Sequence, residues 1–95
     1  MGFFGSSKPK VSGTEYRKHV QGALLSKGLS RHSLDVVNMV FDVALNGATD
    51  LTRGIDSHEI DRGVQFLRDH HGKYNIPLSQ IDIVEEVLRK YIKSF

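Results

Sequence analysis

The sequence predicts an all-α domain of four helices arranged as two helical hairpins, and three observations support this class. In four stretches of the chain, apolar residues recur at intervals of three and four, which places them along one side of a helix. Residues that favour helix starts precede these stretches, and glycine or asparagine follows three of them. The chain has 95 residues, 39% of them hydrophobic, which is enough for one core but not for two.

The most apolar stretch, residues 34–45, is expected to form the second helix at the centre of the domain. Its sequence is LDVVNMVFDVAL, in which only three residues are plainly polar: Asp35, Asn38 and Asp42. The others form an apolar stripe and extend it around the helix: Leu34, Val36, Val37, Met39, Val40, Phe41, Val43, Ala44 and Leu45. We therefore expect the other three helices to enclose this one.

Before this helix, the chain is predicted to form a flexible N-terminal arm of residues 1–12 and then a first helix. The arm shows no apolar periodicity. Ser12 and Glu15 have the spacing of a capping box, so the first helix should begin near Gly13, and Gly28 should end it in a left-handed conformation. Its inward face comprises Tyr16, Val20, Ala23, Leu24 and the aliphatic part of Lys27. Residues 13–95 then make up a single domain.

Two further helices follow a polar loop. Asp56 and Glu59 form a second capping-box pair, which predicts a third helix over residues 57–71 that ends at Gly72. The fourth helix should begin at Ser79. The inward faces of these two helices are expected to comprise Ile60, Val64, Leu67 and His71, and then Ile81, Val84, Leu88, Tyr91, Ile92 and Phe95.

Two aromatic residues and a short acylation pattern distinguish the N-terminal arm. Phe3 and Phe4 are expected to fold back onto the domain, to contact a partner, or to enter a membrane interface with help from nearby lysines. The first six residues also fit the myristoylation pattern M-G-x-x-x-[ST], with Gly2 as the acceptor. A single acyl chain anchors a protein only weakly, so an ordinary N-terminus is the simpler interpretation.

Composition excludes several classes of protein. The absence of cysteine rules out disulfides, thiolate metal sites and a cysteine nucleophile. No run of about 20 apolar residues could cross a membrane, and no stretch is similar to a secretory signal, so a cytoplasmic, soluble protein is expected. The net charge is only +2, since 13 lysines and arginines are mixed with 11 acids, and it does not by itself indicate a nucleic-acid partner.

The sequence GIDSHEI at residues 54–60 follows a helix and a short polar loop and begins another helix. Over residues 41–67 this arrangement resembles the helix-loop-helix of the EF-hand superfamily. When Ile55 takes the central hydrophobic position of the twelve-residue loop, oxygen-ligand positions fall on Asp50, Thr52, Asp56 and Glu59. The resemblance implies a candidate calcium site at these four residues. It also implies an EF-hand-like shape, which such families often keep for gripping helices or peptides after losing metal.

The same loop departs from the EF-hand pattern at three places. Ala48 occupies the opening position that should be aspartate, Arg53 replaces the glycine of the sharp turn, and Gly54 comes one place late. Calcium needs six to eight oxygen ligands. A helix cap and ordinary turn chemistry also explain the four candidate ligands. We therefore expect no cofactor, with weak calcium binding as the alternative.

The remaining polar residues predict neither a zinc site nor an enzyme. His58, His70 and His71 share a helix, but adjacent side chains point about 100° apart, and no H-x-x-x-H spacing occurs. No nucleophile elbow, glycine-rich phosphate loop or paired-carboxylate pattern is present. Six cations give the first third of the chain a basic character: Lys8, Lys10, Arg17, Lys18, Lys27 and Arg31. The helix that follows them is too apolar to lie in the major groove of DNA.

The sequence therefore favours a non-enzymatic protein-protein interaction module that binds a protein partner or a second copy of itself. Six residues that the helical stripes do not require are the candidates for its binding surface: Phe3, Phe4, Met39, Tyr74, Ile76 and Phe95. The alternatives are a weak calcium-binding protein, a nucleic-acid binder that uses the basic end, and a membrane-surface binder that uses the N-terminal arm.

Overall fold

The structure, a computed structural model, describes residues 9–46 and 54–92 of the chain. Its elements are, in order, β1 (Lys10–Val11), α1 (Gly13–Glu15), the π-helical stretch η1 (Tyr16–Val20), α2 (Gln21–Ser26), α3 (Arg31–Leu45), β2 (Ile55–Asp56), α4 (Ser57–Asp69), α5 (His71–Tyr74) and α6 (Leu78–Tyr91). The elements α1, η1 and α2 follow one another without a break and are called here the first helix. Helix dominates the described chain, which confirms the predicted all-α class.

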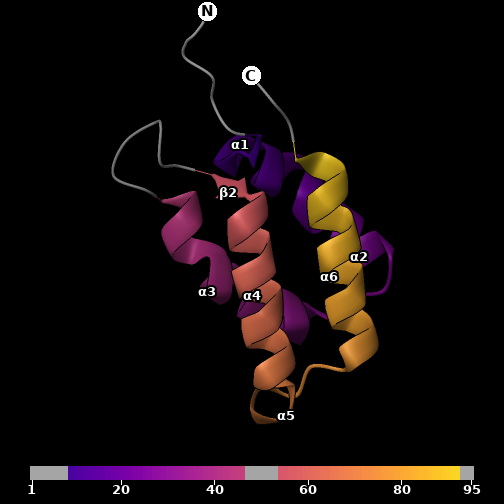
Figure 1. The fold of residues 1–95 in the computed structure, drawn as a ribbon. Coiled ribbons are helices and arrows are strands. Elements are labelled where there is room, and N and C mark those ends of the chain that lie inside the picture. The colour runs from indigo at the N-terminus through magenta and orange to yellow at the C-terminus, as the bar shows by residue number, and fades with distance from the viewer. Residues whose placement is uncertain (1–8, 47–53, 93–95) are drawn as a thin grey trace, which may run out of the picture.

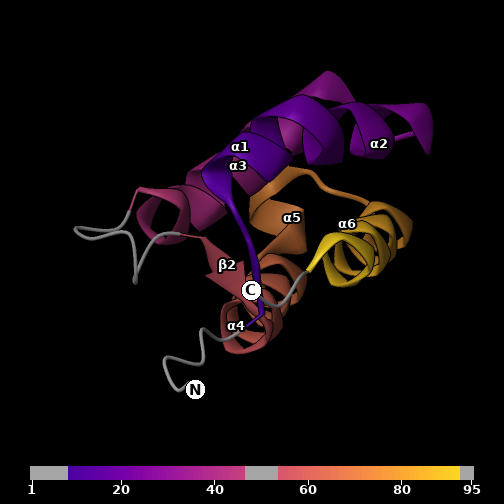
Figure 2. The same ribbon diagram turned by 90° about the horizontal axis from the view of Figure 1, so that it is seen from above.

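The helices form two layers (Figures 1 and 2). The first helix and α3 lie in one layer, and α4 and α6 lie in the other. The most extensive contact between helices joins α4 to α6, while α3 packs against both α2 and α4. The single turn of α5 connects α4 to α6 at the end of the domain opposite β2.

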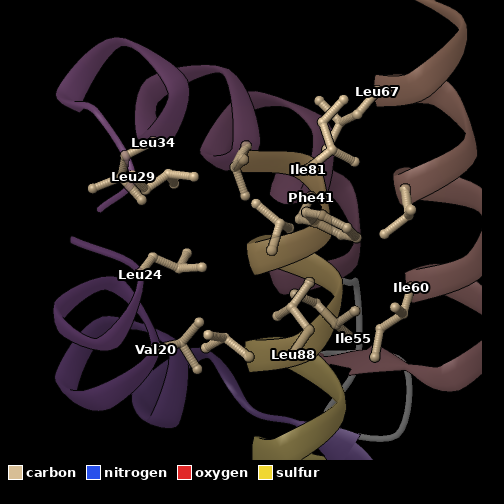
Figure 3. Close-up of a cluster of buried hydrophobic side chains, with 14 of the residues drawn as sticks. Val20, Leu24, Leu29, Leu34, Phe41, Ile55, Ile60, Leu67, Ile81 and Leu88 are labelled. Atoms are coloured by element: carbon tan, nitrogen blue, oxygen red, sulfur yellow. The ribbon is translucent and has the colours of Figure 1, made fainter. Parts of the chain in front are cut away.

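Side chains from both layers meet in one hydrophobic core, part of which is drawn in Figure 3. The predicted inward residues of the helices are largely buried: Tyr16, Val20, Leu24, Leu34, Val36, Val37, Phe41, Ala44, Ile60, Val64, Leu67, Ile81, Val84 and Leu88. Apolar periodicity located this core correctly because a helix repeats its faces every 3.6 residues. His71 is exposed, contrary to its predicted inward position, because α4 ends at Asp69.

The end of the predicted flexible arm belongs instead to the folded domain. Lys10 and Val11 form an antiparallel pair with β2, in which Val11 lies opposite Ile55, and both apolar side chains are fully buried. Gly54 makes this approach feasible, since its φ is +108° and a Cβ there would lie 2.9 Å from the carbonyl oxygen of Val11. The prediction of an arm up to residue 12 is therefore wrong for Lys10 and Val11, because two residues are too few to show strand alternation.

Helix ends show where local signals succeed and fail. Gly28 ends the first helix with a φ of +108°, as predicted, and the Leu29 amide bonds the carbonyl of Leu24. Gly72, the predicted stop of the third helix, lies within α5 instead, and Asn75 takes the left-handed conformation with a φ of 56°. The last helix begins at Leu78, one residue before the predicted Ser79, and no side chain caps it.

A partly buried polar contact joins the first helix to α3. The Tyr16 hydroxyl donates a 2.6 Å hydrogen bond to Oδ1 of Asn38, which also accepts a 3.2 Å bond from the amide nitrogen Nε2 of Gln21. Burial raises the pKa of the Tyr16 hydroxyl because the interior disfavours the phenolate. This contact explains why Asn38, a polar residue, lies among the apolar residues of α3.

Candidate functional site

One side of α3 faces outward and still carries apolar residues. Val36, Val37 and Phe41 are buried as expected, but Met39 is 52% exposed and Val43 is 83% exposed. The prediction that the other helices enclose residues 34–45 is therefore wrong for these two positions. Met39 and Val43 are four residues apart, so they lie one above the other on the same face of the helix.

A glycine brings α4 unusually close to α3. Gly63 lies in the middle of α4, and a Cβ built on it would be 2.3 Å from Cζ of the Phe41 ring. The ring therefore packs directly on the α4 backbone, which no larger residue at position 63 would permit without movement. This close contact forms the floor of a groove between the two helices.

The α3–α4 groove has a volume of about 300 Å³ and is mostly apolar. It is lined by Val40, Phe41, Val43 and Ala44 from α3, and by Glu59, Arg62, Gly63 and Phe66 from α4. The two helices run in opposite directions, since Gly54 before α4 donates to Ala44 near the end of α3, and His32 near the start of α3 bonds the Tyr74 carbonyl after α4. The groove thus runs between the C-terminal half of α3 and residues 59–66 of α4.

Aromatic rings extend the apolar surface beyond the groove toward α5. Phe66 is 37% exposed and stacks on His70 with ring centroids 4.3 Å apart, while the Tyr74 ring lies 6.1 Å from Phe66. The His70 ring is held by a 2.9 Å hydrogen bond between its Nδ1 and the Phe66 carbonyl. The Lys73 ammonium lies 5.6 Å from the centroid of the Tyr74 ring. A continuous aromatic surface therefore follows α4 into α5.

The two charged residues that line the groove differ in their interactions. Oε1 of Glu59 accepts a 3.1 Å hydrogen bond from the Asp56 amide, and Oδ1 of Asp56 accepts a 2.8 Å bond from the Glu59 amide. This reciprocal pair is the predicted capping box of α4. Arg62, in contrast, is exposed and forms no ion pair with any carboxylate in the described part of the chain.

The predicted partner-binding residues have different outcomes. Met39 is exposed beside the groove and Tyr74 is half-buried at the end of the aromatic surface, so both are accessible. Ile76 is only 2% exposed, which makes its prediction as a surface residue wrong. It is buried because Asn75 turns the chain back and the Ile76 amide bonds the His71 carbonyl. Three further candidates lie outside the described residues: Phe3, Phe4 and Phe95.

Sequence reasoning did not assign Val43 and Phe66 to the surface. A signal for Val43 was present, because Asp35 and Asp42 on α3 mark the outward face, and Met39 and Val43 lie beside them at helical spacing. Phe66 had no comparable signal, since it directly precedes the buried Leu67 and its exposure depends on how α3 and α5 pack around it.

Two of the predicted calcium ligands, Asp50 and Thr52, lie outside the described residues. The other two, Asp56 and Glu59, are the capping pair whose carboxylates bond the backbone at the start of α4. Within residues 9–46 and 54–92, no cluster of three or more histidine, aspartate or glutamate side chains could hold a metal ion.

The helices of the described chain are too short or too polar to cross a lipid bilayer. The described cations of the basic end are mostly exposed, although Lys27 forms a 3.3 Å ion pair with Glu86 of α6. No protein-family model, curated protein or solved structure matches this chain.

Proposed function

We propose that this protein is a non-enzymatic interaction module that binds an amphipathic helix of a protein partner in the α3–α4 groove. The observation that carries this proposal is the exposure of Val43 and Phe66, which line an apolar groove, with the exposed Met39 one helical turn before Val43. Contiguous apolar surface beside a groove is typical of protein-binding sites, whereas single exposed apolar residues are ordinary.

The shape of the groove favours a helix as its occupant. Two antiparallel helices form its walls, and the exposed residues of α3 repeat at the spacing of one helical turn, which suits apolar anchors at positions i, i+3, i+4 and i+7 of a partner. A partner strand would need an exposed sheet edge, but β1 and β2 have only two residues each. The lining side chains offer mainly apolar contacts, which suit binding rather than chemistry.

We also propose that α3 and α4 form an EF-hand-like pair of helices that does not bind calcium in the ordinary way. Ile55, at the position of the central hydrophobic residue of an EF-hand loop, is buried and paired in β2. Gly54 provides a left-handed turn directly before it. Asp56 and Glu59 serve as the cap of α4, which supports a structural role for these carboxylates.

The proposal can be tested by titrating the isotope-labelled protein with a synthetic amphipathic helix of about four turns that carries leucines at i, i+3, i+4 and i+7 and glutamines elsewhere. We expect saturable amide shifts in Val40–Ala44 and Glu59–Phe66. Val43→Gln should weaken binding about fivefold, since it removes one exposed anchor. Leu78→Gln is the matched control, because Leu78 is 52% exposed on α6 and does not line the groove.

Two results would contradict this function. Shifts that spread evenly over the surface, or that Leu78→Gln reduces as much as Val43→Gln does, would place the binding elsewhere. Shifts in the groove that grow with protein concentration in the absence of peptide would identify a second copy as its occupant. Titration with calcium tests the proposal of an EF-hand-like helix pair separately, because saturable shifts at the start of α4 would contradict a capping role alone.

A further inference from the structure

The arginines of α4 and α6 differ in whether they form ion pairs, and this difference indicates the charge of the proposed partner helix. Arg68 of α4 donates to Asp82 and Glu85 of α6, with both N–O distances at 3.0 Å. Arg89 of α6 pairs with Asp61 of α4 and with Glu85 at 2.8 Å. Arg62 has no such carboxylate in the described chain, although it lies one residue from Asp61. It is the arginine that lines the α3–α4 groove.

The acids nearest to the groove keep their negative charge, but they bond other groups and form no ion pair with Arg62 in the described chain. Glu59 lines the groove, but its carboxylate bonds the Asp56 amide in the helix cap. Asp42, on the outward face of α3, accepts a 2.8 Å hydrogen bond from Nδ2 of Asn46 through its Oδ1. Neither carboxylate is within ion-pair distance of the guanidinium. In the described part of the chain, the guanidinium of Arg62 therefore lies at the edge of an apolar groove without a carboxylate partner.

We infer that the partner helix is acidic beside its apolar face and places a carboxylate on Arg62. The inference rests on the proposed function, and it adds the charge of the partner to it. The guanidinium offers up to five N–H donors in a planar fork, which fits a carboxylate through two parallel hydrogen bonds. When the apolar anchors of the partner are buried, its flanking residues lie at the edge of the groove. A carboxylate there pairs with Arg62, and both charged groups keep most of their hydration because the edge is exposed to solvent.

The effect of this pair is selectivity among partners of similar apolar pattern. A charge at the rim of an interface changes association rates and discriminates against the wrong sign of charge more than it adds affinity. A helix with lysine at the same position would place a second positive charge beside Arg62, and the two cations would repel each other. The groove thus selects acidic amphipathic helices over basic ones, while apolar contacts provide most of the binding.

The test compares two synthetic helices with the same leucine face as above. One carries glutamate at the positions that flank the apolar stripe on both sides, and the other carries lysine there, so either binding orientation places a charge near Arg62. At low salt, we expect the acidic peptide to bind about fivefold more tightly than the basic peptide. Arg62→Glu should reverse the preference, and added salt should reduce it.

The matched control is Lys18→Glu, which alters the net charge by the same two units on the first helix. That helix packs against α3 and α6, and Lys18 does not line the groove. The control should keep the preference for the acidic peptide. If Lys18→Glu reduces the preference as much as Arg62→Glu does, the selectivity comes from net charge and the inference is overturned.

Two other outcomes distinguish a failure of the acidic-partner inference from a failure of the proposed helix-binding function. Equal binding of both peptides in the groove would overturn the acidic partner and leave the interaction module standing. Binding of none of the synthetic helices, including the neutral glutamine one, would overturn both. Circular dichroism of each variant at the titration temperature verifies that a change in binding is not a change in folding.

Discussion

The two sides of α4 are built differently. On the side of α6, apolar residues are buried and ion pairs cross the edge of the contact, where Arg68 and Arg89 each bond carboxylates of the other helix. On the side of α3, Gly63 permits a close contact with Phe41, but Val43 and Phe66 remain exposed beside Arg62, which forms no ion pair within the described residues. One interface is closed by its own ion pairs, whereas the other leaves apolar residues exposed, and this difference is the basis of the proposed helix binding.

The largest expected effect concerns the floor of the groove. Phe41→Ala should lower the free energy of unfolding by about 3–5 kcal/mol, since the buried ring contacts α4 and its loss leaves a cavity. Urea denaturation followed by circular dichroism measures this change. A loss below about 1 kcal/mol would mean that α3 and α4 do not pack through this ring.

A smaller effect is expected from filling the close contact. Gly63→Ala should destabilise the protein by about 1–3 kcal/mol, because the new Cβ would overlap the Phe41 ring. Gly22→Ala is the matched control, since no atom lies within 4 Å of a Cβ at this helical glycine. The control should stabilise the protein by about 0.5–1 kcal/mol. If the two substitutions changed the free energy of unfolding equally, the Phe41 ring would not pack directly on the α4 backbone at Gly63.

The ion pairs on the other side of α4 should contribute less. Arg89→Gln removes the contacts with Asp61 and Glu85, all of them partly exposed, and should cost about 0.2–1 kcal/mol at low salt. The loss should shrink in high salt because exposed charges are screened. Unfolding curves at two salt concentrations measure both quantities, and a loss independent of salt would point to packing of the arginine stem instead.

The smallest expected effect on stability is at the exposed wall of the groove. Val43→Gln should change the free energy of unfolding by less than about 0.5 kcal/mol, since the side chain is 83% exposed. The same substitution should weaken helix binding, as proposed above. A large loss of stability would indicate that Val43 is buried and that the groove is closed in the free protein.

The elements that the sequence predicted well depend on neighbours within a few residues. The N-caps at Ser12 and Asp56, the glycine stop at Gly28 and the inward faces of the long helices all follow from contacts over three to five positions. The misplaced stop at Gly72 has a local cause too, because Asn75, three residues later, adopts the left-handed conformation that ends α5.

The candidate site was less predictable because it depends on contacts between distant parts of the chain. Met39 was expected at the surface and is exposed. The exposure of Val43 and Phe66, in contrast, depends on how closely α3 packs against α4. Ile76 was expected at the surface and is buried, since a turn at Asn75 returns it to the core. Whether an apolar residue faces the core or the solvent is decided by the neighbouring helix rather than by the residue itself.

The sequence by itself determined the helical class, most helix boundaries and the main core residues. Apolar periodicity, N-caps and glycine stops depend only on residues within a few positions of one another. Only the tertiary structure decided the pairing of Val11 with Ile55, the contact of Phe41 with Gly63 and the unpaired state of Arg62 in the described chain. The first two features join residues separated by about 20 to 45 positions in the sequence, and the distance between such residues is fixed only when the helices pack.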